Sequence, residues 1–229
     1  MFAKGGEVVD DTKWERYGAL GGIVFVVLVI ASIVVASGNA MASDSAAEIL
    51  KYFRDNQDGI KVSAFLSILA SVPIIWWAGS LWSRLHRVGD RHNRLAVIAV
   101  LGLLIGGVGN LTQTAVSAVV ALRLPDVAPV TAKFFFVLSL AFGAGGLIGI
   151  AVLVFAVSVA AFRLGAFPKW VGWLGVVDGL AFLVAAYSIA STSDAIATFG
   201  FVAFILWAIW LIATSVVMYR ATYEEPARD

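Results

Sequence analysis

Long apolar runs, separated by short polar segments, make up most of this sequence. A hydrocarbon core about 30 Å thick needs roughly 20 helical residues, each rising about 1.5 Å. Backbone groups find no water in lipid, so apolar runs of this length are predicted to be helices. Six runs qualify, and they cover residues 17–37, 60–82, 95–122, 134–162, 171–191 and 196–219. The sequence therefore predicts a single all-α integral membrane domain over residues 1–229, a bundle of six transmembrane helices.

The composition excludes several classes of protein. Of the 229 residues, 61% are hydrophobic and 14% are charged, whereas soluble domains have about 45–50% and about 25%. So large an apolar share cannot be hidden inside one water-soluble globule. The net charge of +1 provides no basic surplus for binding nucleic acid. The lack of cysteine excludes disulfides and thiolate metal ligands.

The first apolar run is predicted to be a retained membrane anchor. Ala40-Met41-Ala42 resembles a signal-peptidase site. The run over residues 17–37 is longer than the apolar region of a signal peptide, however, and acidic residues precede it. We therefore expect this segment to stay in the membrane.

Lysine and arginine are divided unevenly between the two sides of the predicted bundle. One side holds 11 of them, namely Lys4, Lys13, Arg16, Arg84, Arg87, Arg91, Arg94, Arg163, Lys169, Arg220 and Arg228. The other side holds 5, namely Lys51, Arg54, Lys61, Arg123 and Lys133. Because short cytoplasmic loops carry the excess of positive charge, both termini are predicted to be cytoplasmic.

The segment between the first two runs, residues 43–59, has the pattern of a short amphipathic helix. Ser45 and Glu48 have the spacing of a capping box. An apolar stripe lies opposite a charged one; the stripes are Ala46, Ile49, Leu50 and Phe53, and Glu48, Lys51, Arg54 and Asp55. We expect this helix to lie on the outer membrane interface. It would serve there as a connector that covers the bundle, or as a substrate lid.

Asp178 is the one acidic residue well inside a predicted span. It lies about 10 Å past the start of the fifth helix, at about 1.5 Å per residue. An ionised carboxylate in mid-membrane costs roughly 2.5–3.5 kcal/mol, so Asp178 should face protein or water rather than lipid. Gly175 precedes it on the same helix face, in a stripe of small residues suited to close helix packing.

Several polar side chains are candidates to meet Asp178. Trp76, Trp77 and Trp210 fall in about the same layer, counted from the inner helix ends, and a buried indole N–H needs an acceptor. Asn110 and Gln113 lie in the long third span. The hypothesis is an intramembrane polar cluster of Asp178 with Trp210 or Trp76, joined by Asn110 and its neighbour Gln113.

Two opposed roles are open for Asp178. It could be a protonated or hydrogen-bonded residue that fixes helix packing, or a proton- or cation-coupling site of a transporter. No second acid or base lies well inside a span to complete a relay. This favours the packing role.

Proline and glycine indicate further features of the helices. Pro73 removes a backbone donor from the second helix, so a kink or hinge is expected there. Gly145 and Gly149 form a small-xxx-small motif for helix contact in the fourth span, within the chain or with another subunit.

The remaining candidate chemistry is weak. His86 and His92 flank Asp90 in a basic segment, which is typical of a solvated loop near anionic headgroups; a metal site or pH sensor is the alternative. Motifs for nucleotide binding, zinc hydrolysis and serine hydrolysis are missing. No catalytic residue, metal or cofactor is predicted.

Two stretches carry a resemblance to a known group. Ala46-Ala47-Glu48-Ile49-Leu50-Lys51-Tyr52-Phe53-Arg54-Asp55-Asn56 leads into a helix that ends Gly79-Ser80-Leu81-Trp82-Ser83-Arg84-Leu85. Later comes Gly165-Ala166-Phe167-Pro168-Lys169-Trp170-Val171-Gly172-Trp173-Leu174-Gly175. With these, the chain resembles a group of uncharacterised actinobacterial multi-pass membrane proteins. The resemblance implies a bacterial plasma membrane and brings no activity with it.

The sequence thus favours a non-enzymatic membrane protein with a binding or accessory role. Its expected partners are membrane lipids, a second copy of the chain or other membrane subunits, and not nucleic acid. The alternative is a small-solute or proton-coupled transporter or channel that uses Asp178.

Overall fold

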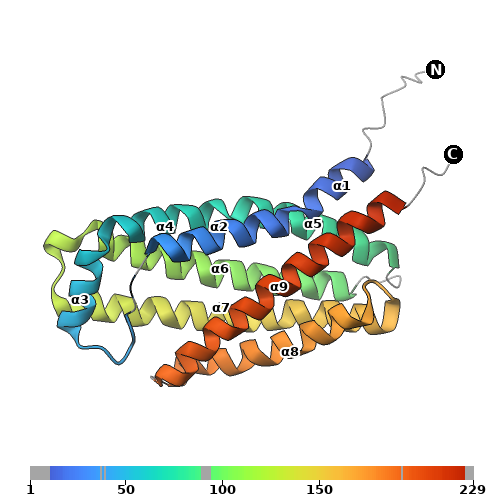
Figure 1. Cartoon of the computed structure of the whole chain (residues 1–229). Coiled ribbons are helices and arrows are strands. Elements are labelled where there is room, and N and C mark those ends of the chain that lie inside the picture. Colours follow the sequence, from blue (N-terminus) through green and yellow to red (C-terminus); the bar gives the residue numbers. More distant parts are fainter. Residues whose placement is uncertain (1–10, 37, 39, 89–93, 192, 225–229) are drawn as a thin grey trace, which may run out of the picture.

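The chain folds into a bundle of long helices. The computed structural model describes residues 11–36, 38, 40–88, 94–191 and 193–224, and every regular element within these ranges is a helix (Figure 1). Six helical segments of the described chain are long and apolar enough to cross a membrane, and they are Trp14–Ala36, Gln57–Val88, Arg94–Leu122, Pro129–Leu164, Lys169–Ala190 and Phe199–Ala221. The six predicted spans are therefore confirmed as helices, although several ends differ from the predicted ones.

The first span consists of two helices, which the apolar pattern did not show. α1 (Asp11–Ala19) and α2 (Gly21–Ala36) meet at Leu20, and α1 is tilted away from the axis of α2 (Figure 1). Glycine-containing stretches are common places for a helix to bend. Gly21 is also required for contact, because a Cβ atom there would collide with the backbone carbonyl of Pro73.

The second span is interrupted as Pro73 predicted. α4 (Gln57–Leu69) ends just before Ala70, and α5 begins at Ser71 and runs to Val88. The break lies three residues before Pro73, within the turn where a proline ring crowds the preceding carbonyls. The bends of the first and second spans thus lie against each other, with Gly21 over Pro73.

α6 (Arg94–Leu122) and α7 (Pro129–Leu164) form the closest helix pair, joined through a short 3-10 helix, η1 (Leu124–Asp126). Glycines make the close approach possible: a Cβ atom on Gly149 would lie 2.5 Å from both the carbonyl oxygen of Gly102 and the backbone nitrogen of Gly106. α7 is longer than the predicted run. Proline at its first position and a left-handed glycine after its last one, Gly165 at φ +66°, bound it.

The last two spans complete the bundle. α8 (Lys169–Ala186) continues into the 3-10 helix η2 (Tyr187–Ala190), and α9 (Asp194–Glu224) crosses the bundle obliquely (Figure 1). The guanidinium of Arg16 in α1 donates a hydrogen bond of 2.7 Å to the Tyr219 hydroxyl in α9. The beginning of the first span and the end of the last therefore lie at the same end of the bundle.

α3 (Ala46–Asp55) lies across the opposite end of the bundle (Figure 1). The predicted capping box is present, with the Glu48 amide donating to the Ser45 hydroxyl and the Ser45 amide donating to the Glu48 carboxylate. These hydrogen bonds lower the pKa of the Glu48 carboxyl. The apolar stripe packs against the ends of α6 and α7 through Phe53, whose ring centroid is 6.2 Å from that of Phe136. The short helix between the first two spans is thus present with its apolar side packed on the bundle, and its place on the outer membrane interface stays a prediction.

Candidate functional site

α8 carries Asp178 on its buried face. The exposed fraction of Asp178 is 0%. One turn earlier, a Cβ atom on Gly175 would collide with the Ser158 hydroxyl of α7 and would lie 2.9 Å from Nε1 of Trp210 in α9 and 3.2 Å from the Val154 carbonyl oxygen. The missing side chain at Gly175 thus lets α7 and α9 approach α8 beside the carboxyl group.

Two tryptophans of α9 flank the level of Asp178. Trp210 lies against Gly175, three residues before Asp178. Trp207 contacts Phe182, four residues after Asp178, with ring centroids 6.4 Å apart. Residues three and four apart share one face of a helix. Asp178 therefore faces the stretch of α9 between these two indoles.

Two further helices complete this level of the bundle. The Trp77 ring of α5 meets the Trp210 ring edge to face, with centroids 6.1 Å apart. On α2, a Cβ atom at Gly22 would collide with the Ser215 hydroxyl of α9 and lie 3.0 Å from Nε1 of Trp77. We call Asp178, Trp77, Trp207, Trp210 and Ser215 the interior layer; the contacts of its members reach α2, α5, α7, α8 and α9.

The polar atoms of the interior layer have no hydrogen-bond partner among the described residues. These atoms are both carboxyl oxygens of Asp178, Nε1 of Trp77, Trp207 and Trp210, and Oγ of Ser215. Neighbouring hydroxyls are satisfied by their own helices, since Ser158 donates to the Val154 carbonyl at 2.7 Å. Leaving a buried polar group unpaired costs about 1–3 kcal/mol. The layer therefore combines tight burial with unmet hydrogen bonding.

The tryptophans are placed differently from the sequence hypothesis. Trp210 does lie at the Asp178 level, but its Nε1 donates no hydrogen bond to the carboxyl group. Trp76 is 54% exposed and stacks on Trp14 at a centroid distance of 5.8 Å. Its neighbour Trp77 is fully buried in the layer. Trp76 and Trp77 lie at nearly the same depth along α5. Consecutive residues of a helix are rotated by about 100° around its axis, so the two side chains point to different sides.

Asn110 and Gln113 do not join the interior layer. The Gln113 amide lies against Gly143 of α7, and Asn110 is exposed. At the level of the layer, α6 contributes Gly102, which packs against Leu153. Asn110 is eight residues further along α6, which is about 12 Å of helix. Sequence could not place it, because the long span left its depth undetermined.

Of the three glycines predicted for helix packing, two lie in helix contacts and one does not. Gly149 and Gly175 are both in close helix contacts, whereas a Cβ atom on Gly145 would meet nothing within 4 Å. Gly146 takes the place of Gly145, since a Cβ atom on it would lie 3.1 Å from the Gly106 carbonyl oxygen. The glycines of α7 that contact α6 are therefore three residues apart rather than four. Side chains three apart form one of the two ridges by which helices pack, and the predicted motif followed the ridge of residues four apart.

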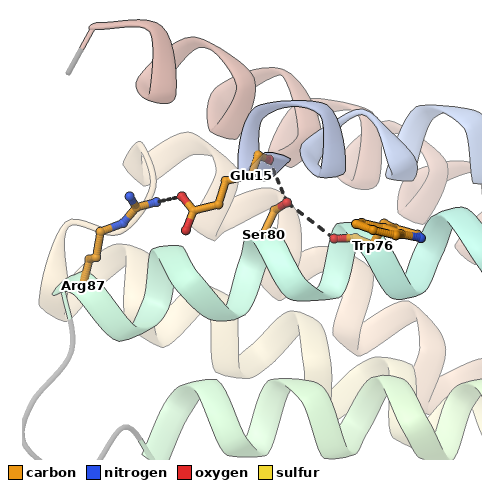
Figure 2. Close-up of polar contacts among 4 residues, drawn as sticks. All are labelled: Glu15, Trp76, Ser80 and Arg87. Atoms are coloured by element: carbon orange, nitrogen blue, oxygen red, sulfur yellow. Dashed lines mark hydrogen bonds and ion pairs between the residues drawn. The ribbon is translucent and has the colours of Figure 1, made fainter. Parts of the chain in front are cut away.

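A second polar region lies where α1, α5 and α9 meet. Figure 2 shows the Ser80 hydroxyl donating to the backbone carbonyls of Glu15 at 2.8 Å and Trp76 at 3.4 Å, and Arg87 pairing with the Glu15 carboxylate at 2.6 Å. We call this region the end cluster; it consists of Glu15, Ser80, Arg84 and Arg87. The sequence places Arg84 and Arg87 among the basic residues of one side and does not predict that they meet Glu15 and Ser80.

Arg84 connects the end cluster to the α7–α8 junction. Its Nε–H donates a hydrogen bond of 2.6 Å to the Ala166 carbonyl oxygen, and its guanidinium carbon lies 4.8 Å from the centre of the Phe167 ring. A pocket of about 180 Å³ opens beside the cluster. Its lining residues are Glu15, Ser80, Arg84, Arg87, Val88, Met218 and Ala221.

The histidine segment is only partly covered by the structure. His86 stacks on Trp82, with ring centroids 6.4 Å apart. Asp90 and His92 lie outside the described residues. Within the described ranges, no three histidine, aspartate or glutamate side chains gather in a way that could hold a metal ion.

Comparison of the chain with protein-family models, curated proteins and solved structures gives no match. The helices therefore define the class of protein on their own. Six apolar helices of membrane-crossing length belong to a multi-pass membrane protein. The interior layer and the end cluster are two places in the described bundle where polar side chains from several helices meet.

Proposed function

We propose that this chain is a non-enzymatic membrane protein that acts by binding partner membrane subunits or lipids. The observation that carries the proposal is the closed interior layer, in which the exposed fractions of Asp178, Trp77 and Trp210 are all 0%. A transporter must bring solute or water to its coupling group, and an enzyme must bring substrate to its reactive one. A carboxyl group sealed among indoles supports neither use.

We further propose that the chain lies in a bacterial plasma membrane with both termini in the cytoplasm and α3 on the outer side. The 11-to-5 division of lysine and arginine supports this orientation. The end cluster would then face the cytoplasmic headgroups. The resemblance to actinobacterial membrane proteins supports the choice of membrane.

One observation favours the alternative function, a small-solute or proton-coupled transporter. The carboxyl group of Asp178 and its neighbouring indoles have no hydrogen-bond partners in the described part of the chain. A polar layer of this kind is costly, and intramembrane acids often mark ion pathways. In a second conformation with an opened layer, Asp178 would be the coupling group.

Reconstitution into liposomes distinguishes the two functions. A potassium diffusion potential drives protons inward, and a trapped pH-sensitive dye reports their flux. We expect the same flux with the purified protein as with protein-free vesicles. Proton flux that disappears in a folded Asp178→Asn variant would overturn the proposal and support the transporter.

A second measurement addresses binding directly. The protein is extracted in native nanodiscs, captured through a C-terminal tag, and its bound proteins and lipids are quantified by mass spectrometry. We expect a membrane protein or a lipid class at constant stoichiometry with the chain. Recovery of bulk membrane lipid alone, with no added subunit, would contradict the binding role.

A further inference from the structure

The pocket beside the end cluster lies at the depth of lipid headgroups. The three spans that form it end or begin there, at Trp14, Val88 and Ala221. Ser80 is its deepest lining residue, eight residues before Val88, which is about 12 Å of helix. The exposed stacked indoles of Trp14 and Trp76 lie beside it. Such aromatic pairs are typical of the membrane–water interface.

The described residues that line the pocket carry a net positive charge. Two arginines and one glutamate line it, and Arg87 is already paired with the Glu15 carboxylate at 2.6 Å. Glu15 is the one carboxylate among the described lining residues, and it pairs with Arg87. No described lining residue therefore neutralises the charge of Arg84. The pocket therefore attracts an anion, and Arg84 is the side chain with charge to offer it.

Arg84 is held in a way that suits anion binding. Its Nε–H bonds the Ala166 carbonyl, and one face of the guanidinium lies over Phe167. These contacts fix the orientation of the planar group. A guanidinium has four further N–H donors on its two terminal nitrogens, in the fork geometry that matches phosphate oxygens.

We propose that this pocket binds a phosphate group, with Arg84 as the residue that contacts it. The other walls are apolar and are formed by Val88, Met218 and Ala221. Charged side chains next to apolar ones fit a phosphodiester that carries acyl chains. The same chemistry would accept free phosphate. This site rests on the lipid-binding part of the proposed function and gives that part a location, and its failure would leave the binding of partner subunits untouched.

Glu15 limits the affinity of the site. It pairs with Arg87, so removal of its charge by Glu15→Gln makes the pocket one unit more positive. The variant should therefore bind the phosphate group more tightly than the wild type does. This gain of binding does not depend on any change at Arg84.

The test is native mass spectrometry of the full chain in detergent, titrated with phosphatidylglycerol or phosphatidylethanolamine. We expect preferential binding of phosphatidylglycerol, a loss of about tenfold in Arg84→Gln, or about 1.4 kcal/mol, and tighter binding in Glu15→Gln. Arg163→Gln is the matched control, because Arg163 is exposed in the last turn of α7 and does not line the pocket. Circular dichroism verifies that each variant is folded.

Inorganic phosphate provides the second arm of the experiment. Competition by phosphate would show that the free anion is the ligand, and its absence would assign the site to the lipid. Equal losses in Arg84→Gln and Arg163→Gln would show only general surface attraction and overturn the proposal. Unchanged binding in Glu15→Gln, or no preference over phosphatidylethanolamine together with no phosphate binding, would overturn it as well.

Discussion

The two polar regions of the bundle differ in how their polar groups are satisfied. In the end cluster, Ser80 donates to two backbone carbonyls and Glu15 pairs with Arg87 (Figure 2). In the interior layer, the carboxyl oxygens of Asp178 and the indole nitrogen of Trp210 have no hydrogen-bond partner among the described residues. The first region borders the end of the bundle, and the second is fully buried.

This difference shows how location sets the energetic weight of a polar side chain. Exposed ion pairs contribute about 0–1 kcal/mol, because water and salt compete for both partners. A buried polar group without a partner costs about 1–3 kcal/mol. The Glu15–Arg87 pair can thus be altered at small cost, whereas each unpaired group of the interior layer has a larger energetic weight. Four predictions test this contrast.

The largest effect is expected where the interior depends on close helix contact. Gly149→Ala places a Cβ atom 2.5 Å from backbone atoms of α6, which cannot move independently of that helix. We expect the free energy of unfolding to fall by about 3 kcal/mol, as measured by denaturant titration in micelles. Gly145→Ala, where a Cβ atom meets nothing within 4 Å, is the matched control on the same helix. Equal effects of the two substitutions would contradict the assignment of Gly149, and not Gly145, to the contact between α6 and α7.

Asp178→Ala should stabilise the bundle. It removes a carboxyl group that is buried and has no hydrogen-bond partner among the residues that the structure describes, so the free energy of unfolding should rise by about 1–3 kcal/mol, less a small cavity cost. The same micelle titration measures it. A loss of stability would show that the carboxyl group has a hydrogen-bond partner in the membrane. The proposed difference between the interior layer and the end cluster would then be wrong.

Ser80→Ala should have the opposite sign. The variant loses the hydroxyl that joins α1 to α5, and we expect a decrease of about 1 kcal/mol. Hydrogen exchange should locate this change in the amides of α1, with those of α2 unaffected. Faster exchange throughout the bundle would indicate that Ser80 supports the core instead.

The smallest effect is expected for the Glu15–Arg87 ion pair. The side chains are 25% and 45% exposed, so a double-mutant cycle of Glu15→Gln and Arg87→Gln should give a coupling of about 0.2–1 kcal/mol. The coupling should decrease between low and high salt. A value above about 2 kcal/mol, insensitive to salt, would place this pair in the energetic class of buried pairs.

The features that sequence predicted well depend on neighbours along the chain. The spans follow from the length of apolar runs, the α3 capping box from two residues three positions apart, and the interruption of the second helix from Pro73. The bend at Leu20 was missed, because an apolar run that contains glycine reads as one continuous helix. Asp178 was predicted to face protein or water because an ionised carboxylate is costly in lipid, and the structure buries it.

Sequence by itself determined which segments are helices and where polar residues fall along each one, since both follow from local chemistry and the thickness of the membrane. Only the tertiary structure decided how each helix is rotated about its axis. That rotation buries Trp77 instead of Trp76 and Gly146 instead of Gly145. The physical reason is that lipid and helix interior are equally apolar, so hydrophobicity does not distinguish the two faces. Close packing between helices makes the choice.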